Sequence, residues 1–274
     1  MKFTCRAAAL LALTAVAGAA SAQDVIATVQ NPWEGWFAGA NIGGVWNNTC
    51  NTWEPSAAIR GNPTLANDFY NRNCPNNGSF LGGLDGGYNF QSDAWVWGVK
   101  VDFEFMESKN KNLSYTYANK GAGDPFPSGT YTATGKFKPD GVVLVGPRLG
   151  YAIDQWLPWI RAGGAFVFGS SNSQLGFVPA AGETVPAAHF NGSRNFTSNG
   201  WNVGAGLDYD INGPWSITAE YNYIQLGKGN SSAITCSTGS AASGICAKYA
   251  NFSLDNIHNS FTANMFRVGV RFRF

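Results

Sequence analysis

The chain has 274 residues, with 18 Lys and Arg against 17 Asp and Glu and a formal net charge of +1. This balance offers no basic surface to nucleic acid, so we exclude DNA and RNA as partners. The 34 glycines and the 10 Trp, 10 Tyr and 19 Phe are many for a water-soluble enzyme of this size. Beyond the N-terminus, no apolar run is long enough for a transmembrane helix.

The N-terminus has the three parts of a secretory signal peptide. Lys2 and Arg6 form a basic region, residues 7–18 form a short apolar stretch, and Ala20-Ser21-Ala22 gives the small-x-small pattern of a cleavage site. We therefore predict export and cleavage before Gln23. Losing the two basic residues leaves 16 positive against 17 negative side chains, a net charge of about −1.

Eight segments then alternate between apolar and polar residues, which is the period of a β-strand. Their apolar faces lie within residues 36–46, 80–90, 97–105, 143–151, 160–168, 201–209, 215–223 and 266–274. The clearest internal case has one face made of Trp97, Val99, Val101, Phe103 and Phe105, opposite Gly98, Lys100, Asp102 and Glu104.

The last of these segments indicates the surroundings of the strands. One of its faces is entirely apolar, opposite three arginines, and consists of Phe266, Val268, Val270, Phe272 and Phe274. Such a strand suits a closed barrel whose apolar side meets lipid and whose polar side meets the lumen. The terminal Phe274 also resembles the C-terminal signal read by the machinery that inserts outer-membrane barrels, so we expect that machinery to be a partner.

The connections alternate between short and long. Tight turns rich in Asp, Asn and Gly are predicted at 91–94, 153–155 and 212–214. Polar loops of roughly thirty residues are predicted at 47–79, 107–140, 170–199 and 227–260, the asymmetry that outer-membrane barrels show. Both chain ends then lie on the short-turn side. Pro147, inside a predicted strand, suggests a β-bulge because a closed barrel has no free edge to hold it.

These patterns predict an all-β fold, an eight-stranded antiparallel up-and-down transmembrane β-barrel with long extracellular loops. The predicted organisation is a signal peptide at 1–22, a periplasmic N-terminal segment at 23–34 and the barrel at 35–274. A soluble eight-stranded ligand-binding barrel is the alternative at the level of the fold.

Several of the strands resemble a known family. Residues 35–44, GWFAGANIGG, resemble the W-x-G-[FW]-Y-x-G-x-N-x-G opening of small outer-membrane β-barrel proteins common in alphaproteobacteria, often called porin-like proteins or opacity-type surface antigens. Further matches are GGYNFQ at 86–91, WGVKVDF at 97–103 and GWNVGAG at 200–206. The resemblance implies a place in the outer membrane of a Gram-negative bacterium. The functions of this family are diverse.

Charged residues recur on the faces predicted to line the lumen. These are Lys100, Asp102, Glu104, Arg148, Arg161, Asp208, Glu220, Arg267 and Arg271. Asp102 and Glu104 would stand roughly 7 Å apart, near the separation of an inverting glycosidase pair. We favour a salt-bridge network instead, because buried charges need partners and five cations stand against four carboxylates. So close a balance in a narrow barrel predicts a filled lumen.

Other candidate sites are few. His189 and His258 are the only histidines, and neither has a second ligand at metal spacing, so we expect no metal, no cofactor and no enzymatic activity. Cys50 and Cys74 both fall in the first predicted loop. Cys236 and Cys246 both fall in the last one. Cys5 lies in the predicted signal peptide, so the exported protein would keep these four cysteines. This even count favours two disulfides, one within each loop, over metal binding.

Three functional classes follow. The favoured one is a structural and surface-interaction protein that contributes to envelope integrity, is surrounded by outer-membrane lipid and lipopolysaccharide, and offers its loops to host or phage molecules. A small-solute, porin-like channel is the second class, and a lipid-modifying barrel enzyme is the third. The enzyme would need a nucleophile and base pair, which the sequence does not display.

Overall fold

The protein is described here from a computed structural model. The structure describes residues 32–55, 71–73, 76–107, 112–118, 129–182, 184, 188–211, 213–227, 229–235 and 253–274. The residues from Trp33 to Phe274 form one compact unit. Residues 1–31 lie outside the described residues, so the signal peptide and its cleavage site remain predictions.

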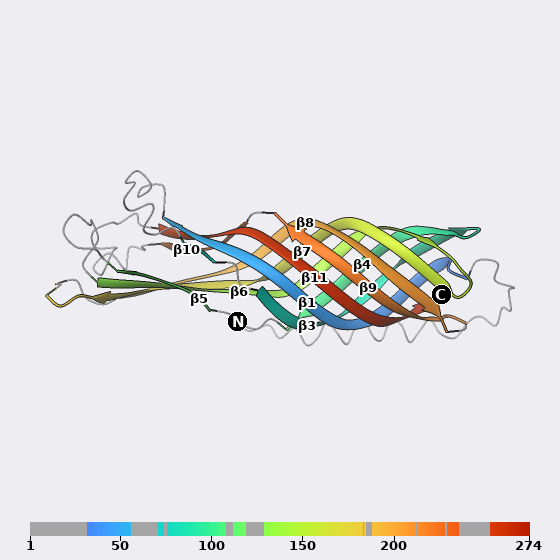
Figure 1. Ribbon diagram of the computed structural model, residues 1–274, viewed down its shortest axis with the longest axis horizontal. Helices are drawn as coiled ribbons and strands as arrows, with labels where there is room; N and C mark the ends of the chain where they lie inside the picture. Colours follow the sequence, from blue (N-terminus) through green and yellow to red (C-terminus); the bar gives the residue numbers. More distant parts are fainter. Residues whose placement is uncertain are drawn as a thin grey trace. The chain divides into compact units, whose positions relative to one another are not determined.

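Eight long strands form a closed antiparallel ring, which confirms the predicted barrel (Figure 1). In ring order they are β1 (Gly35–Pro55), β3 (Asn76–Ser92), β4 (Trp95–Met106), β6 (Gly129–Tyr151), β7 (Trp156–Pro179), β8 (Ala188–Asp210), β9 (Trp215–Leu226) and β11 (Ser253–Arg273). Pairing of β11 with β1 closes the ring. Three short strands pair with the long ones, namely β2 (Asn71–Asn73) with β1, β5 (Asn112–Ala118) with β6, and β10 (Gly229–Thr235) with β11. Within the described part of the chain, no helix is long and apolar enough to cross a membrane.

The pairing register around the ring sets the tilt of the strands relative to the barrel axis. The paired residues can be followed around the barrel from Gly35 through Asn89, Gly98, Arg148, Arg161, Gly204, Asn222 and Met265 to Val45. The path returns to β1 ten residues beyond its start. For eight strands, this stagger corresponds to a strand tilt of roughly 43° and to an interior that side chains can fill.

One end of the barrel, which we call the turn end, carries the tight turns and the C-terminus (Figure 1). The residues at the turns adopt left-handed conformations, with φ of 52° at Asp93, 51° at Asp154 and 75° at Gly213. Asp and Gly tolerate this region best, which explains the composition of these turns. The backbone N–H of Phe274 donates to the carbonyl of Trp36 at 2.9 Å, so the last residue is fastened to the first strand.

A ring of aromatic side chains surrounds the barrel near the turn end. When the tilt is taken into account, each of the eight strands places one of them at the same height, namely Trp36, Tyr88, Trp97, Tyr151, Trp156, Tyr209, Trp215 and Phe272. Neighbouring rings touch, as in Trp36 and Tyr88 (centroids 5.1 Å apart) and Trp215 and Phe272 (4.9 Å). Aromatic girdles of this kind mark the interface of a membrane.

A second aromatic level lies further along the strands. It includes the outward-facing Trp46, Phe80, Phe105, Phe166 and Trp201, all more than 40% exposed. Trp36 and Trp46 are ten residues apart on β1, which at this tilt is a height of about 24 Å. That height matches the apolar band of an outer-membrane barrel, about 25 Å. Most outward side chains between the two levels are apolar, including all of the predicted face of β11.

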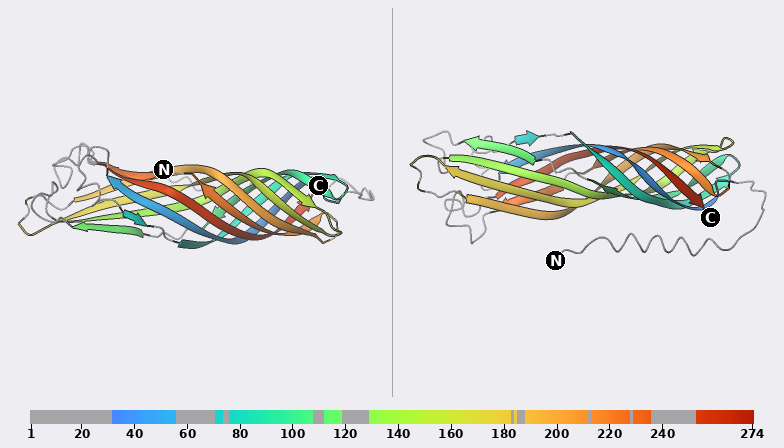
Figure 2. Two further views of the ribbon diagram at one scale, coloured as in Figure 1. Left: turned by 45° about the horizontal axis from the view of Figure 1, so that its top comes forward. Right: turned by 90° about the horizontal axis from the view of Figure 1, so that it is seen from below.

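The end opposite the turn end, which we call the long end, differs from the prediction (Figure 2). Instead of thirty-residue loops, β6, β7 and β8 continue far beyond the second aromatic level, and β7 and β8 stay paired out to Phe177 and Ala188. Most of the predicted loop at 170–199 is therefore strand, as are parts of the other three. The polar alternation of these stretches is too weak to separate a strand in water from a loop.

The expectation of a β-bulge at Pro147 is wrong. The β4–β6 ladder passes through the pair Val99 and Pro147 without a shift. The β6–β7 ladder omits two residues there and resumes in the same register at Arg148 and Arg161. An interrupted ladder accommodates the missing N–H of proline as well as a bulge does. The register shift of this ladder lies higher up, between Pro139 and Gly141.

Candidate functional site: the charged lumen

The inward side chains of β4 form the centre of the lumen. Strand alternation places Lys100, Asp102 and Glu104 on the same face, and all three are buried. Glycines on neighbouring strands make room for such long side chains in a narrow barrel. A Cβ at Gly83 would lie 2.2 Å from Oε2 of Glu104, and one at Gly206 would lie 2.3 Å from the ring of Trp159.

Two carboxylates hold this centre together. Asp102 pairs with Lys100, Arg161 and Arg267, the last at 3.0 Å. Glu220, across the lumen on β9, pairs with Lys100 at 2.6 Å and with Arg267 at 2.6 Å. Longer contacts join Glu220 to Arg161 at 3.4 Å and to Arg271 at 3.5 Å. These side chains come from β4, β7, β9 and β11, so the network braces opposite walls.

Glu104 lies on the side of this centre that is nearer the long end. It pairs with Arg267 and accepts a hydrogen bond of 3.0 Å from Nδ2 of Asn41 on β1. Asp102 and Glu104 therefore both face Arg267. Neither carboxylate stands free over open space, so their spacing does not make a glycosidase-like pair.

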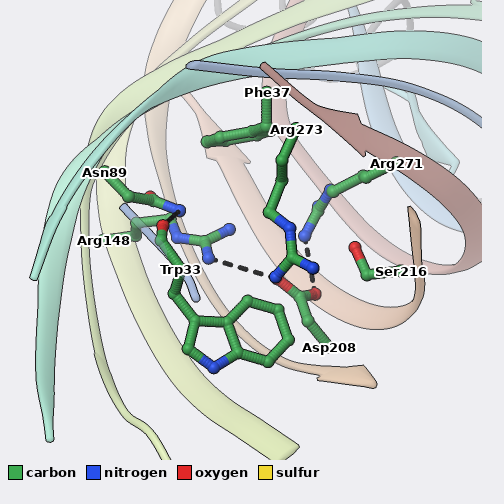
Figure 3. Close-up of a pocket in the computed structure, with 8 residues that line it drawn as sticks. All are labelled: Trp33, Phe37, Asn89, Arg148, Asp208, Ser216, Arg271 and Arg273. Carbon is green, nitrogen blue, oxygen red and sulfur yellow. Dashed lines mark hydrogen bonds and ion pairs between the residues drawn. The ribbon is translucent and has the colours of Figure 1, made fainter. Parts of the chain in front are cut away.

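A second cluster lies nearer the turn end (Figure 3). The guanidinium of Arg271 donates to Asp85 at 2.6 Å and to Asp208 at 2.6 Å. Asp208 also accepts from Arg148 at 3.1 Å and from the indole of Trp159 at 3.0 Å. Three hydrogen-bond donors thus offset the cost of burying the Asp208 carboxylate.

The structure brings all nine charged residues of the sequence prediction into this one network and adds a tenth, Asp85, which is 5% exposed. Its inward position follows from the alternation of its strand, but the predicted charge count omitted it. With Asp85, five cations face five carboxylates. The lumen therefore has no formal net charge among the described side chains.

Apolar side chains close the lumen on both sides of the charges. Toward the long end lies a cluster of inward residues, namely Val45, Leu81, Met106, Val142, Leu144, Ala165, Val167, Ile224, Leu226, Ala263 and Met265. Toward the turn end lie Trp33, Val96, Leu157 and Trp159. The sequence prediction, which assumed a polar lumen throughout, missed the first cluster. Runs such as Val142 to Val145 are apolar on both faces, so alternation could not reveal an apolar interior.

Trp33 caps the mouth of the barrel at the turn end. It is 2% exposed and lies under the guanidinium of Arg273, 4.7 Å from its ring centre. Its backbone N–H donates to Gln91 at 3.0 Å, and its carbonyl accepts from Asn89 at 3.1 Å. Trp33, two residues before β1, is thereby fixed as a plug.

A cavity of about 10 Å³ lies between this cap and the charges, lined by Trp33, Phe37, Asn89, Arg148, Asp208, Ser216, Arg271 and Arg273 (Figure 3). That space suits about one water molecule. Among the described side chains, Nε and Nη1 of Arg148 and Oδ1 of Asn89 are buried without a hydrogen-bonding partner. A water here can accept from the arginine and donate to the amide. The cavity is too small for a solute.

The remaining predicted sites have little described geometry. The described residues hold no group of three or more His, Cys, Asp or Glu arranged for a metal ion. The side chains of His189 and His258 lie outside the described part. So do those of Cys50, Cys74, Cys236 and Cys246, although the backbone of Cys50 pairs with Ser260. Both disulfides thus stay predictions.

A closed antiparallel ring with an apolar outer band between aromatic levels defines a transmembrane β-barrel. Comparison with known proteins agrees. The family model described as "Outer membrane protein beta-barrel domain" matches residues 8–274. The 31 kDa outer-membrane immunogenic protein of Brucella melitensis is 29% identical over 157 residues, which cover 56% of each chain. The chain thus spans about half the length of that relative.

Two solved structures are also matched, at low similarity. Ail, the attachment invasion locus protein of Yersinia pestis, is matched with a TM-score of 0.29 and 14% identity, covering 87% of this chain and 99% of that one. The outer membrane protease OmpT from Escherichia coli is matched with a TM-score of 0.43 and 9% identity, covering 92% and 99%. The chain belongs to the outer membrane protein β-barrel family, and its location is the outer membrane of a Gram-negative bacterium.

Proposed function

We propose that this protein is a non-conducting structural barrel that holds a strand-built platform above the outer membrane for contact with other molecules. The observation that carries the first half is the filling of the lumen. Ten interlocked charges lie between an apolar cluster and the Trp33 cap, and the cavity at the cap has room for about one water. An ion crossing this barrel would have to break several buried ion pairs at once.

The long end supports the second half of the proposal, a platform of strands above the outer membrane. Paired strands rise from the second aromatic level, and β7 reaches Pro179, about 30 Å further along the barrel axis. The tight turns at the other end expose little surface. In barrels of this class, the long connections face the cell exterior and the short turns face the periplasm. We infer the same orientation here.

The relatives support a surface role in general terms. The Brucella protein is named as immunogenic, and Ail is named as an attachment invasion locus protein. Those properties belong to these proteins. For this chain they favour contact at the exposed end over transport, and non-enzymatic action over the protease activity for which OmpT is named. The five carboxylates of the lumen lie in ion pairs, which also disfavours acid–base catalysis there.

A conductance measurement tests the closed lumen. Purified wild-type protein in a planar bilayer should give no steady current, while a general porin in the same bilayer serves as the positive control. A stable, ion-selective current from the wild type would replace this proposal with the small-channel function.

Labelling of intact cells tests the orientation. Ala181→Cys, exposed between β7 and β8 at the long end, should react with a membrane-impermeant maleimide above the wild-type background. Asp154→Cys, at a tight turn, should react only after the cells are broken. The reverse labelling pattern would refute the proposal that the long end faces the cell exterior.

A further inference from the structure

The long-end extensions of β6, β7 and β8 share one continuous outer face. Its outward positions on β7 continue the apolar row of Phe166 and Phe168 as Ser170, Asn172 and Gln174. The register shift near Asp140 keeps the upper part of β6 in phase with this face, because it compensates for one residue. We call the outward side chains that the structure describes within 130–138, 170–178 and 193–199 the polar face.

The composition of the polar face is unusual for a surface in water. Among the described side chains it has thirteen outward positions, of which ten carry a hydroxyl or carboxamide group, one is a lysine and none is acidic. Cross-strand pairs bring these groups together, for example Ser170 with Asn195 and Asn172 with Ser193. Asn172, Gln174, Ser193 and Asn195 are exposed. Such pairs present donors and acceptors about 5 Å apart across strands and about 7 Å apart along them.

The height of the polar face above the apolar band limits which molecules it can contact. Asn199 lies level with Trp46, at the edge of the apolar band, and Ser193 lies six residues higher, about 15 Å along the barrel axis. In the outer leaflet of a Gram-negative outer membrane, this layer is occupied by the sugars of lipopolysaccharide. The face is continuous with the lipid-contacting surface below it.

The charges favour sugar over other partners. The one lysine among the described side chains of the polar face is Lys138, and it pairs with Asp140 at 3.1 Å. A surface built for phosphate alone would carry more free cations, and a protein-binding surface would carry exposed aromatic anchors. Neutral amides and hydroxyls match the hydroxyl groups of saccharides, which both donate and accept.

We propose that the polar face binds the core saccharide of lipopolysaccharide in the surrounding outer leaflet. The inference rests on the proposed function, because it requires the long end to face the cell exterior. Amides and hydroxyls on β7 and β8 would hold the sugar, while the apolar band below contacts the acyl chains of the same molecule.

The test compares two double variants of the full-length protein in lipid nanodiscs. Asn172→Ala/Asn195→Ala removes two amides from the polar face. Asn48→Ala/Thr262→Ala is the matched control, because these two residues form an outward polar pair just above Trp46 on the β1–β11 wall. Binding is measured by native mass spectrometry with three probes: lipopolysaccharide with its core saccharide, lipid A without it, and free core oligosaccharide.

Wild type and control should bind complete lipopolysaccharide about tenfold more tightly than lipid A, as expected for a few added hydrogen bonds. The Asn172→Ala/Asn195→Ala variant should lose this preference and bind lipid A unchanged. An unchanged preference in that variant, or none in the wild type, would overturn the proposal. So would free oligosaccharide that binds as tightly as the complete lipid, because the ligand would then be a soluble saccharide. Maleimide labelling of Ala181→Cys, which lies outside the polar face, separates these outcomes from a wrong orientation.

Discussion

Replacing Asp102 with Asn should strongly destabilise the barrel while leaving the shape of the side chain almost unchanged. Asp102 is fully buried and faces three cations, Lys100, Arg161 and Arg267. The variant keeps the volume but removes the charge, so five cations face four carboxylates. Glu220 contacts the same three cations and cannot neutralise them all.

The size of the effect follows from burial. Leaving a buried charge without its partner costs about 3–5 kcal/mol. The exposed pair of Lys138 and Asp140, with side chains 44% and 43% accessible, provides the matched control. Asp140→Asn should cost at most about 1 kcal/mol, since water screens that pair.

The assay is guanidinium unfolding of the protein folded into lipid vesicles, followed by the fluorescence of its ten tryptophans. A double-mutant cycle with Arg161→Gln restores the charge balance, so the second substitution should cost less in the Asp102→Asn background than alone. We expect a coupling of about 2 kcal/mol. If Asp102→Asn costs no more than Asp140→Asn, the lumen is wet and the filled-barrel reasoning fails.

Three further predictions concern assembly and topology. Phe274→Ala removes the terminal aromatic that contacts Phe272 (centroids 5.1 Å apart), so surface assembly should fall. Assembly is measured as the heat-modifiable band of outer-membrane fractions. Wild-type levels of this band in the variant would contradict the role of Phe274 as an assembly signal. Non-reducing peptide maps should join Cys50 to Cys74 and Cys236 to Cys246, and free thiols or bridges between loops would refute this pairing. Protease added to intact cells should cut only within 47–79, 107–140, 170–199 or 227–260, and there outside the paired strands, for example at 180–182. A cut at the turns of Asp93, Asp154 or Gly213 would reverse the orientation.

Much of the candidate site could be predicted because it depends on alternation alone. Lys100, Asp102 and Glu104 had to share a face once their segment was a strand, and the aromatic and aliphatic residues between them had to face outward. Asp85 obeys the same rule, and its omission was an error of counting. The particular ion pairs could not be predicted. Arg267 meets Asp102 across 165 residues of sequence, and nothing local specifies that contact.

The apolar cluster and the long-end strands show where alternation stops being informative. Val142 and Leu144 face inward while Val143 and Val145 face outward, yet all four are aliphatic. On β7 beyond Phe168, residues 170–174 are all Ser, Asn or Gln, so no apolar–polar contrast separates strand from loop. In both places, the choice of face and of structure depends on pairing with β6 and β8.

The sequence by itself determined the strands of the barrel, their outward faces, the tight turns and the charges of the lumen, because these follow from the two-residue period of a strand and the chemistry of its neighbours. Only the tertiary structure decided the ten-residue stagger, the balance of five cations with five carboxylates, the Trp33 cap and the extension of β6, β7 and β8 at the long end. Each of these depends on the register in which distant strands pair, and that register is fixed only when β11 closes the ring on β1.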